Sequence, residues 1–343
     1  MRLSKLLPKR RAWRVLFLVG LILPVPAGVM GSRLIDQAAD RLTTARRYEL
    51  GTDMKRIVAT PGAEGLALEK FTFTTADGLT LRAMIVEADT TSSGEAALEK
   101  SRASLRTHLP SLEAMPSGQY RGTILMMHGI NSREEHMLWH ARWLVAAGFR
   151  CMAWDSRGHG ESEGTTVTFG KHEVNDAARA LAALHARREP GPVLAYGHSM
   201  GAAILLQWLA TAPPVKGAVA VAPFARLSDI MNAQADHVAG GLLKFMIPLV
   251  RREVKQRAGF DPAEISPLGR VGDITCPVFF IHGEQDQVIP VAQSAALRDA
   301  CRVPGSRRTV TPGGHGDALS AGGTALQAEV VKFYMDAAGS GWR

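Results

Sequence analysis

Six predicted strands, most of them followed by a segment with helical spacing, dominate the chain from residue 122 onward. Most are continuous apolar runs, which are typical of parallel strands covered on both faces. They cover residues 123–127, 149–154, 192–196, 217–222, 278–282 and 308–311. Helical patterns lie at residues 133–147, 171–188, 200–211, 291–301 and 323–337. This alternation predicts an α/β fold with helices on both faces of a mostly parallel sheet.

A predicted hairpin precedes the alternation, and two insertions accompany it. Residues 71–86 are predicted to form two strands joined by the turn Asp77-Gly78. Residues 88–120 are polar, which predicts an inserted surface segment that is helical or mobile. Residues 225–272 hold an apolar stretch between two predicted strands, which predicts a small helical cap over the candidate site.

The third predicted strand meets a helical pattern at Gly197-His198-Ser199-Met200-Gly201. Between a strand and a helix, Gly-x-Ser-x-Gly is typical of a nucleophile elbow. The tight turn strains the backbone of the serine, and the flanking glycines avoid crowding it. The pentapeptide alone also fits an ordinary glycine-rich turn, so the context decides. We interpret Ser199 as a candidate nucleophile.

A serine hydroxyl needs a general base, and the base needs an orienting acid. In folds of this kind the chain order is serine, acid, histidine. Asp286 ends a short turn after one predicted strand, and His315 lies in a glycine loop after the next. We predict that Ser199 attacks an acyl carbon, that His315 transfers its proton, and that Asp286 orients the imidazole. Glu284 is the alternative acid.

Other residues of these motifs have supporting roles in this interpretation. Two backbone N–H groups should stabilise the oxyanion, and we assign them to Met200 and Ile130. His128 is predicted to pack the loop that contains Ile130, and His198 and His282 are predicted to be structural.

Two further motifs invite other interpretations. The loop at residues 155–164 resembles a phosphate loop but lacks its Gly-Lys-Ser/Thr ending, so we predict a structural loop held by Asp155 and Arg157. Four residues suggest a metal site but lack the His-Glu-x-x-His order, so we predict a solvated helix face. They are Glu134, Glu135, His136 and His140.

The formal net charge of +8 is concentrated at the start of the chain. Without the six basic residues of the first 14 positions, the 40 basic residues fall to 34, against 32 acidic ones. A near-neutral body argues against a nucleic-acid partner.

The basic start precedes an apolar run at residues 15–29, a pattern typical of an export signal. Residues 1–31 are predicted to be a signal peptide or an uncleaved signal anchor, and residues 32–68 a stalk or linker. Because positive charge stays in the cytoplasm, the remainder is expected outside it. We predict a single-pass membrane protein with an extracytoplasmic catalytic domain, or a periplasmic or secreted protein if the signal is cleaved.

The three cysteines have no metal-binding spacing. Cys151 lies in an apolar strand and is predicted to be a core residue. Cys276 begins one strand and Cys301 ends the helix that follows it, so we hypothesise a disulfide between them.

Five motifs, in order, resemble the α/β-hydrolase superfamily over residues 69–338. Within it, the pattern is similar to the branch of monoacylglycerol lipases, lysophospholipases and serine aminopeptidases. The motifs are His128-Gly129, Asp155-Ser156-Arg157-Gly158-His159-Gly160-Glu161-Ser162, Gly197-His198-Ser199-Met200-Gly201, His282-Gly283-Glu284-Gln285-Asp286 and Gly314-His315.

The resemblance implies an eight-stranded, mostly parallel sheet. It also implies that Ser199, Asp286 and His315 form the catalytic triad, with Ile130 and Met200 as backbone oxyanion donors. No metal or organic cofactor is expected.

We predict hydrolysis of a small-molecule or lipid carboxylic ester through an acyl-enzyme. An apolar cap and a nearby membrane favour hydrophobic or acyl-lipid esters. A serine peptidase or amidase on the same scaffold and a non-catalytic binding protein are the alternatives, because the fold does not settle the chemistry.

Overall fold

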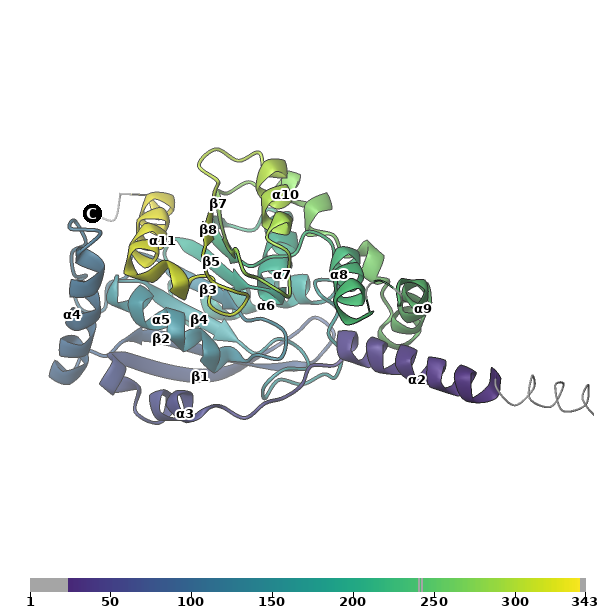
Figure 1. The fold of residues 1–343 in the computed structure, drawn as a ribbon. Helices are drawn as coiled ribbons and strands as arrows, with labels where there is room; N and C mark the ends of the chain where they lie inside the picture. Colours follow the sequence, from purple (N-terminus) through teal and green to yellow (C-terminus); the bar gives the residue numbers. More distant parts are fainter. Residues whose placement is uncertain (1–23, 240, 242, 340–343) are drawn as a thin grey trace, which may run out of the picture.

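One eight-stranded sheet organises the computed structural model, which describes residues 24–339 except 240 and 242. The strand order is β1-β2-β4-β3-β5-β6-β7-β8 (Figure 1). Strand β2 pairs antiparallel with β1 and with β4, and the other pairs are parallel, as predicted. The strands are β1 (Leu66–Thr74), β2 (Thr80–Ala88), β3 (Thr123–Met127), β4 (Arg150–Trp154), β5 (Val193–His198), β6 (Val215–Val221), β7 (Val278–Gly283) and β8 (Arg307–Thr311).

Helices cover both faces of the sheet because its central strands are apolar on both sides. In β3, Leu125 and Met127 belong to one core, whereas Ile124 and Met126 belong to the other. The first core includes α6 (Glu173–His185), α7 (Met200–Leu209) and α10 (Ala292–Ala300). The second includes α3 (Thr52–Ala59), α4 (Ser92–Arg106), α5 (Leu138–Ala146) and α11 (Gly323–Ala338).

The cap between β6 and β7 consists of α8 (Leu227–Ala239), α9 (Ile247–Ala258) and short 3₁₀ turns. It lies at the opposite end of the molecule from α4 (Figure 1). Phe245 and Leu249 are exposed, whereas Val250 and Val254 pack into the first core. The 3₁₀ turns of the cap are η3 (Lys244–Met246), η4 (Pro262–Glu264), η5 (Pro267–Gly269) and η6 (Val271–Asp273). Elsewhere the described chain has η1 (Pro61–Glu64), η2 (Glu134–Met137) and η7 (Ser320–Gly322).

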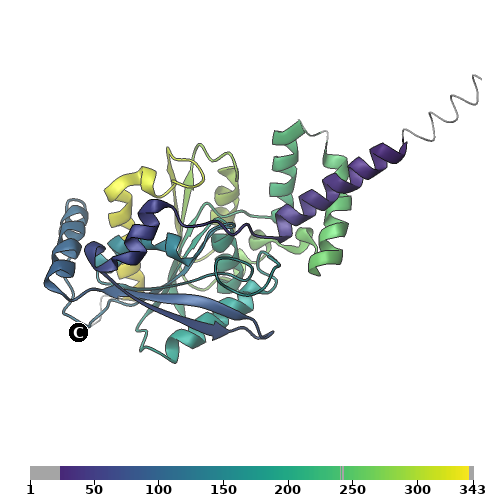
Figure 2. The same ribbon diagram turned by 90° about the horizontal axis from the view of Figure 1, so that it is seen from below.

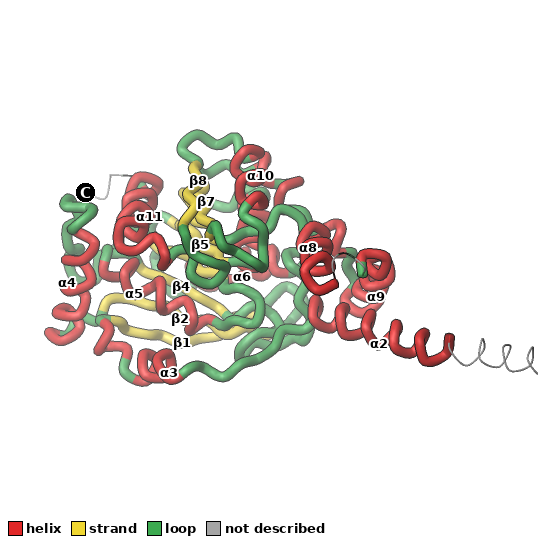
Figure 3. The backbone as a smooth tube through the Cα atoms, viewed as in Figure 1, coloured by secondary structure: helices red, strands yellow, loops and turns green. Residues whose placement is uncertain are grey.

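The segment predicted to be a stalk packs against the rest of the molecule. Helix α2 (Pro24–Thr43) runs beside α9 (Figure 2). Irregular chain then leads to α3 along the body (Figure 3), where Met54 and Ile57 are buried. Residues 32–68 are thus in close contact with the α/β body.

The insertion at residues 88–120 forms a helix with one buried face. Leu98 and Leu105 of α4 are 1% exposed, and the Arg102 guanidinium donates a hydrogen bond to the carbonyl of Ala146. The sequence analysis did not predict this buried face, because the segment is mostly polar and the leucines of α4 recur only once in two turns.

The predictions for the cysteines and for the N-terminal segment have different outcomes. The hypothesis of a Cys276–Cys301 disulfide is wrong in this structure: both are buried free thiols, and Cys301 Sγ lies 3.4 Å from Ser306 Oγ. Residues 1–23 of the predicted signal lie outside the described residues. Within residues 24–339, apart from the two omitted positions, every helix is too short or too polar to span a membrane.

Candidate active site

Ser199 occupies a sharp turn between β5 and α7. Its φ of 54° and ψ of −117° place a non-glycine residue in a strained conformation. A Cβ at Gly201 would lie 2.3 Å from the carbonyl oxygen of Met127, and one at Gly197 would lie 2.7 Å from Ala202 Cα. Both glycines are therefore required by the close approach of neighbouring backbone, as the sequence motif predicted.

The structure brings the three predicted triad side chains into one hydrogen-bonded chain. The Ser199 hydroxyl lies 2.8 Å from His315 Nε2, and His315 Nδ1 lies 2.7 Å from Asp286 Oδ2. With the hydroxyl donating to Nε2, Nδ1–H donates to the carboxylate. Ser199 is 6% exposed and the His315 side chain is 20% exposed, so the serine is sheltered and the histidine borders solvent.

Four donors hold the carboxylate of Asp286. The backbone N–H groups of Val288 and Ile289 donate to Oδ1, each at 2.8 Å. His315 Nδ1 and His282 Nε2 lie 2.7 and 3.2 Å from Oδ2. Burial opposes ionisation, but the bonds from His282, His315 and Ile289 outweigh it and lower the pKa of Asp286 below its ordinary value. The alternative acid, Glu284, is exposed.

Two histidines predicted to be structural contact the triad directly. His198 Nε2–H donates to the carbonyl of His315 at 3.0 Å, and His282 Nε2 also lies 2.9 Å from the carbonyl of Ile289. Burial, with the nearby His315, lowers the pKa of His198 to about 4, so it remains a neutral donor. Sequence reasoning missed these contacts, although the four-residue spacing of His282 and Asp286 across a tight turn is compatible with one.

The loop after β3 lies against the nucleophile. A Cβ at Gly129 would be 3.3 Å from Ser199 Cβ. Buried His128 accepts from the N–H of Ser156 at 3.0 Å through Nε2 and donates from Nδ1 to the carbonyl of Gly129 at 2.7 Å. Burial, with the neighbouring His159, lowers its pKa to about 3, which keeps the ring neutral. The predicted loop-packing role of His128 is therefore confirmed.

Ile130 lies in this loop, and Met200 opens α7 directly after Ser199. Met200 adjoins Ser199 in the chain, and Ile130 follows Gly129, which borders Ser199 Cβ. Their roles as oxyanion donors stay predictions.

The loop at residues 155–164 is held by charged hydrogen bonds, as predicted. Asp155 accepts from the N–H groups of Glu134 and Glu161, each at 2.7 Å. Arg157 binds both carboxylate oxygens of Asp176 at 2.7 Å and those of Asp77 at 2.9 and 3.1 Å.

The prediction of a solvated face is wrong: Glu134 and Glu135 are buried, and His136 and His140 are half-buried. Glu134 and Glu135 are 4% and 2% exposed. Glu135 binds Arg133, whereas Glu134 Oε2 has no hydrogen-bond partner among the described residues. Burial, reinforced by the charge of Asp155, raises the pKa of Glu134 to about 9. In the described part of the chain, no three His, Cys, Asp or Glu side chains are arranged to hold a metal ion.

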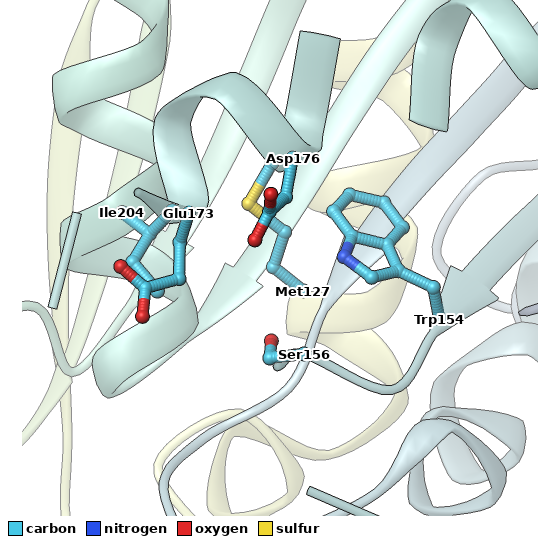
Figure 4. Close-up of a pocket in the computed structure, with 6 residues that line it drawn as sticks. All are labelled: Met127, Trp154, Ser156, Glu173, Asp176 and Ile204. Carbon is cyan, nitrogen blue, oxygen red and sulfur yellow. The ribbon is translucent and has the colours of Figure 1, made fainter. Parts of the chain in front are cut away.

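Two cavities in the described part of the chain lie away from the triad. Six side chains line a void of about 10 Å³ beside β3 (Figure 4), large enough for one water at most. They are Met127, Trp154, Ser156, Glu173, Asp176 and Ile204. A surface pocket of about 320 Å³ lies between the end of the cap and α6 and α7, lined in part by Lys171, Gln207 and Glu264.

The strand order, the elbow and the positions of the three side chains after β5, β7 and β8 define an α/β-hydrolase fold. Among solved structures, the Pyrococcus furiosus esterase Pf2001 aligns with a TM-score of 0.62 at 19% identity, over 84% of this chain and 97% of that one. The Pyrococcus horikoshii acylaminoacyl peptidase aligns with a TM-score of 0.53 at 15% identity, over 81% of this chain and 42% of that one.

The sequence comparisons lead to the same class. Residues 118–261 match the model of a family described as serine aminopeptidase, S33. A Bacillus subtilis (strain 168) protein, "Uncharacterized protein YqkD", is 30% identical over 190 residues, which are 53% of this chain and 61% of that protein. The monoacylglycerol lipase of Mycolicibacterium smegmatis is 28% identical over 230 residues, which cover 58% of this chain and 82% of that protein. The chain therefore has the α/β-hydrolase fold, and its residues 118–261 are similar to the serine aminopeptidase, S33 family.

Proposed function

We propose that the protein is a serine hydrolase that cleaves carboxylic esters through an acyl-enzyme. The observation that carries this proposal is the hydrogen-bonded chain from Ser199 through His315 to Asp286. Because the carboxylate faces Nδ1, the imidazole presents Nε2 to the hydroxyl in the form that accepts a proton.

In the proposed mechanism, Ser199 Oγ attacks the acyl carbon while His315 Nε2 takes its proton. The resulting imidazolium is stabilised by Asp286 and then protonates the leaving alkoxide. The N–H groups of Ile130 and Met200 would stabilise the oxyanion. A water molecule, deprotonated by His315, would attack the acyl-enzyme and release the carboxylic acid and Ser199.

An ester is favoured over a peptide with a free amino terminus. The sequence-related lipase and the structurally similar esterase support ester cleavage, while the family description and the peptidase fold keep amide cleavage as the second candidate. A free ammonium group calls for a carboxylate beside the nucleophile. Two carboxylates of the cap are engaged elsewhere: Glu253 pairs with Arg257, and Glu264 lines the pocket beside α6 and α7. We also propose that the ester is hydrophobic or an acyl lipid, because the cap is apolar.

A fluorophosphonate probe tests the nucleophile, since it labels only an activated serine. We expect one equivalent of label on the wild-type protein and none on Ser199→Ala. Ser104→Ala, at an exposed serine of α4, is the matched control and should label like the wild type. Labelling of Ser199→Ala would refute the assignment. Esters of increasing acyl length, run beside aminoacyl anilides, then test the bond class; faster turnover of the anilides would favour the peptidase.

We further propose export of the protein, on the basis of its N-terminal sequence alone. N-terminal sequencing of the mature protein distinguishes a cleaved signal, with a start near residue 28 or 32, from an uncleaved anchor.

A further inference from the structure

A short segment, residues 43–47, runs from the last residue of α2 toward α3 and contacts two loops, the one after β3 and the one after β4. The carbonyl of Thr43 accepts from the N–H of Val167 at 2.7 Å. The N–H of Arg46 donates to Asn131 Oδ1 at 2.7 Å. We call residues 43–47 the strap. It precedes the region that matches the family model, which begins at residue 118.

Arg47 fixes the strap to the second loop. Its guanidinium donates to the carbonyls of Gly158, Ser162 and Gly164 at 3.3, 2.9 and 3.2 Å. Because one planar group binds three carbonyls, the strap has little freedom to slide relative to the loop. The N–H of Arg46 is therefore presented to Asn131 from a fixed position.

Asn131 is the residue that shapes the turn beside Ser199. The N–H of Ser132 donates to the carbonyl of Gly129 at 3.2 Å, so Ile130 and Asn131 are the two central residues of this turn. Asn131 has a φ of 58°, which turns with this geometry require at the second central position and which asparagine tolerates. The conformation of Asn131 thus helps to set the direction of the peptide groups around Ile130.

We propose that Asn131 is a positioning residue for the oxyanion site, and that it acts through the hydrogen bond from the N–H of Arg46 in the strap. This inference rests on the proposed function, because it assigns the turn at Ile130 to the oxyanion. The N-terminal strap is then part of the active-site architecture. It holds the turn in the orientation that the tetrahedral intermediate needs and adds little to binding of the planar substrate.

A double-mutant cycle separates this bond from other effects. Asn131→Gly keeps the positive φ and removes the acceptor. Arg46→Pro removes the N–H donor and the side chain and also restricts the local backbone. Arg46→Ala, which keeps the N–H, controls for loss of the side chain. Turnover of a p-nitrophenyl ester gives kcat and KM. Inhibition by a trifluoromethyl ketone, which forms a tetrahedral adduct on serine, measures stabilisation of the oxyanion.

We expect Asn131→Gly and Arg46→Pro each to lower kcat about three- to tenfold with KM changed less than twofold. The inhibition constant of the ketone should rise by the same factor, and the double variant should be no worse than either single variant. Equal kcat and ketone inhibition in Asn131→Gly and the wild type would overturn the proposal, as would losses that multiply in the double variant.

Two measurements keep the test decisive. If Arg46→Pro does not fold, Arg47→Ala loosens the strap from the other side and should lower kcat and weaken ketone binding together; unchanged values would overturn the proposal. Fluorophosphonate titration separates a failure of the proposed hydrolase function from a failure of the role proposed for the strap. An unlabelled wild-type protein would mean that the proposed function fails, whereas normal labelling with unchanged variant kinetics would refute only the role of the strap.

Discussion

Replacing Glu134 with glutamine should stabilise the protein, and the gain should grow with pH. Glu134 is 4% exposed, its Oε2 has no partner among the described residues, and the Asp155 carboxylate lies nearby. Burial and that charge raise its pKa from 4.5 to about 9. The folded state therefore holds a proton that the unfolded state releases above pH 4.5.

The sign and size of the effect follow from proton linkage. An acid whose pKa is raised by folding favours the folded state fully only below its unfolded pKa, and that advantage is lost as the pH rises toward 9. At about 1.4 kcal/mol per pH unit, the loss between the ordinary pKa and pH 7 is ~3 kcal/mol. Glutamine keeps the neutral shape without the proton, so Glu134→Gln should recover most of this free energy at pH 7 and little at pH 4.5.

Guanidinium unfolding of both proteins at pH 4.5, 6, 7 and 8 measures the difference. Glu135→Gln is the matched control, because folding shifts the pKa of this neighbouring carboxyl group in the opposite direction. Burial opposes ionisation of Glu135, but the hydrogen bonds and charge of Arg133 outweigh it and lower its pKa. Its stabilisation is present above the unfolded pKa and lost as the pH falls, so Glu135→Gln should destabilise the protein at pH 7. A gain for Glu134→Gln that does not increase with pH would refute this reasoning.

Three further changes have defined outcomes. Asp286→Asn should lower kcat about 10³–10⁴-fold while the protein stays folded, because the imidazole loses its orienting carboxylate; steady-state kinetics and circular dichroism check both points. His198→Phe removes the donor to the carbonyl of His315 and should lower kcat about tenfold, whereas His198→Gln, which can replace Nε2–H, should retain most activity; equal losses would argue against this contact. Arg157→Ala leaves the buried carboxylate of Asp176 unpaired and should reduce the free energy of unfolding by about 3–5 kcal/mol in a denaturant titration, with Arg157→Lys intermediate; a loss below about 1 kcal/mol would contradict the ion-pair assignment.

The sheet and the convergence of Ser199, His315 and Asp286 were predictable because each motif is a local signal. Apolar runs covered on both faces, the glycines around Ser199 and the positions of Asp286 and His315 after successive strands are all visible in short windows of sequence. The strained turn at Ser199 follows from the same pentapeptide, since only glycine fits the flanking positions.

The errors arose where distant segments decide the environment. Glu134 and Glu135 look like solvated helix residues in the sequence, but the fold places the distant residues Asp155 and Lys70 beside them. The contact of the strap with Asn131 joins residues 85 positions apart, and no local sequence pattern predicts it.

The most direct test of the central hypothesis is rapid-quench mass spectrometry during turnover of a p-nitrophenyl ester. We predict a burst of about one equivalent of p-nitrophenol and an acyl group on the peptide that contains Ser199, at a rate that accounts for steady-state turnover. Turnover with no acyl adduct, or an adduct on another residue that forms equally well in Ser199→Ala, would contradict catalysis by Ser199, His315 and Asp286.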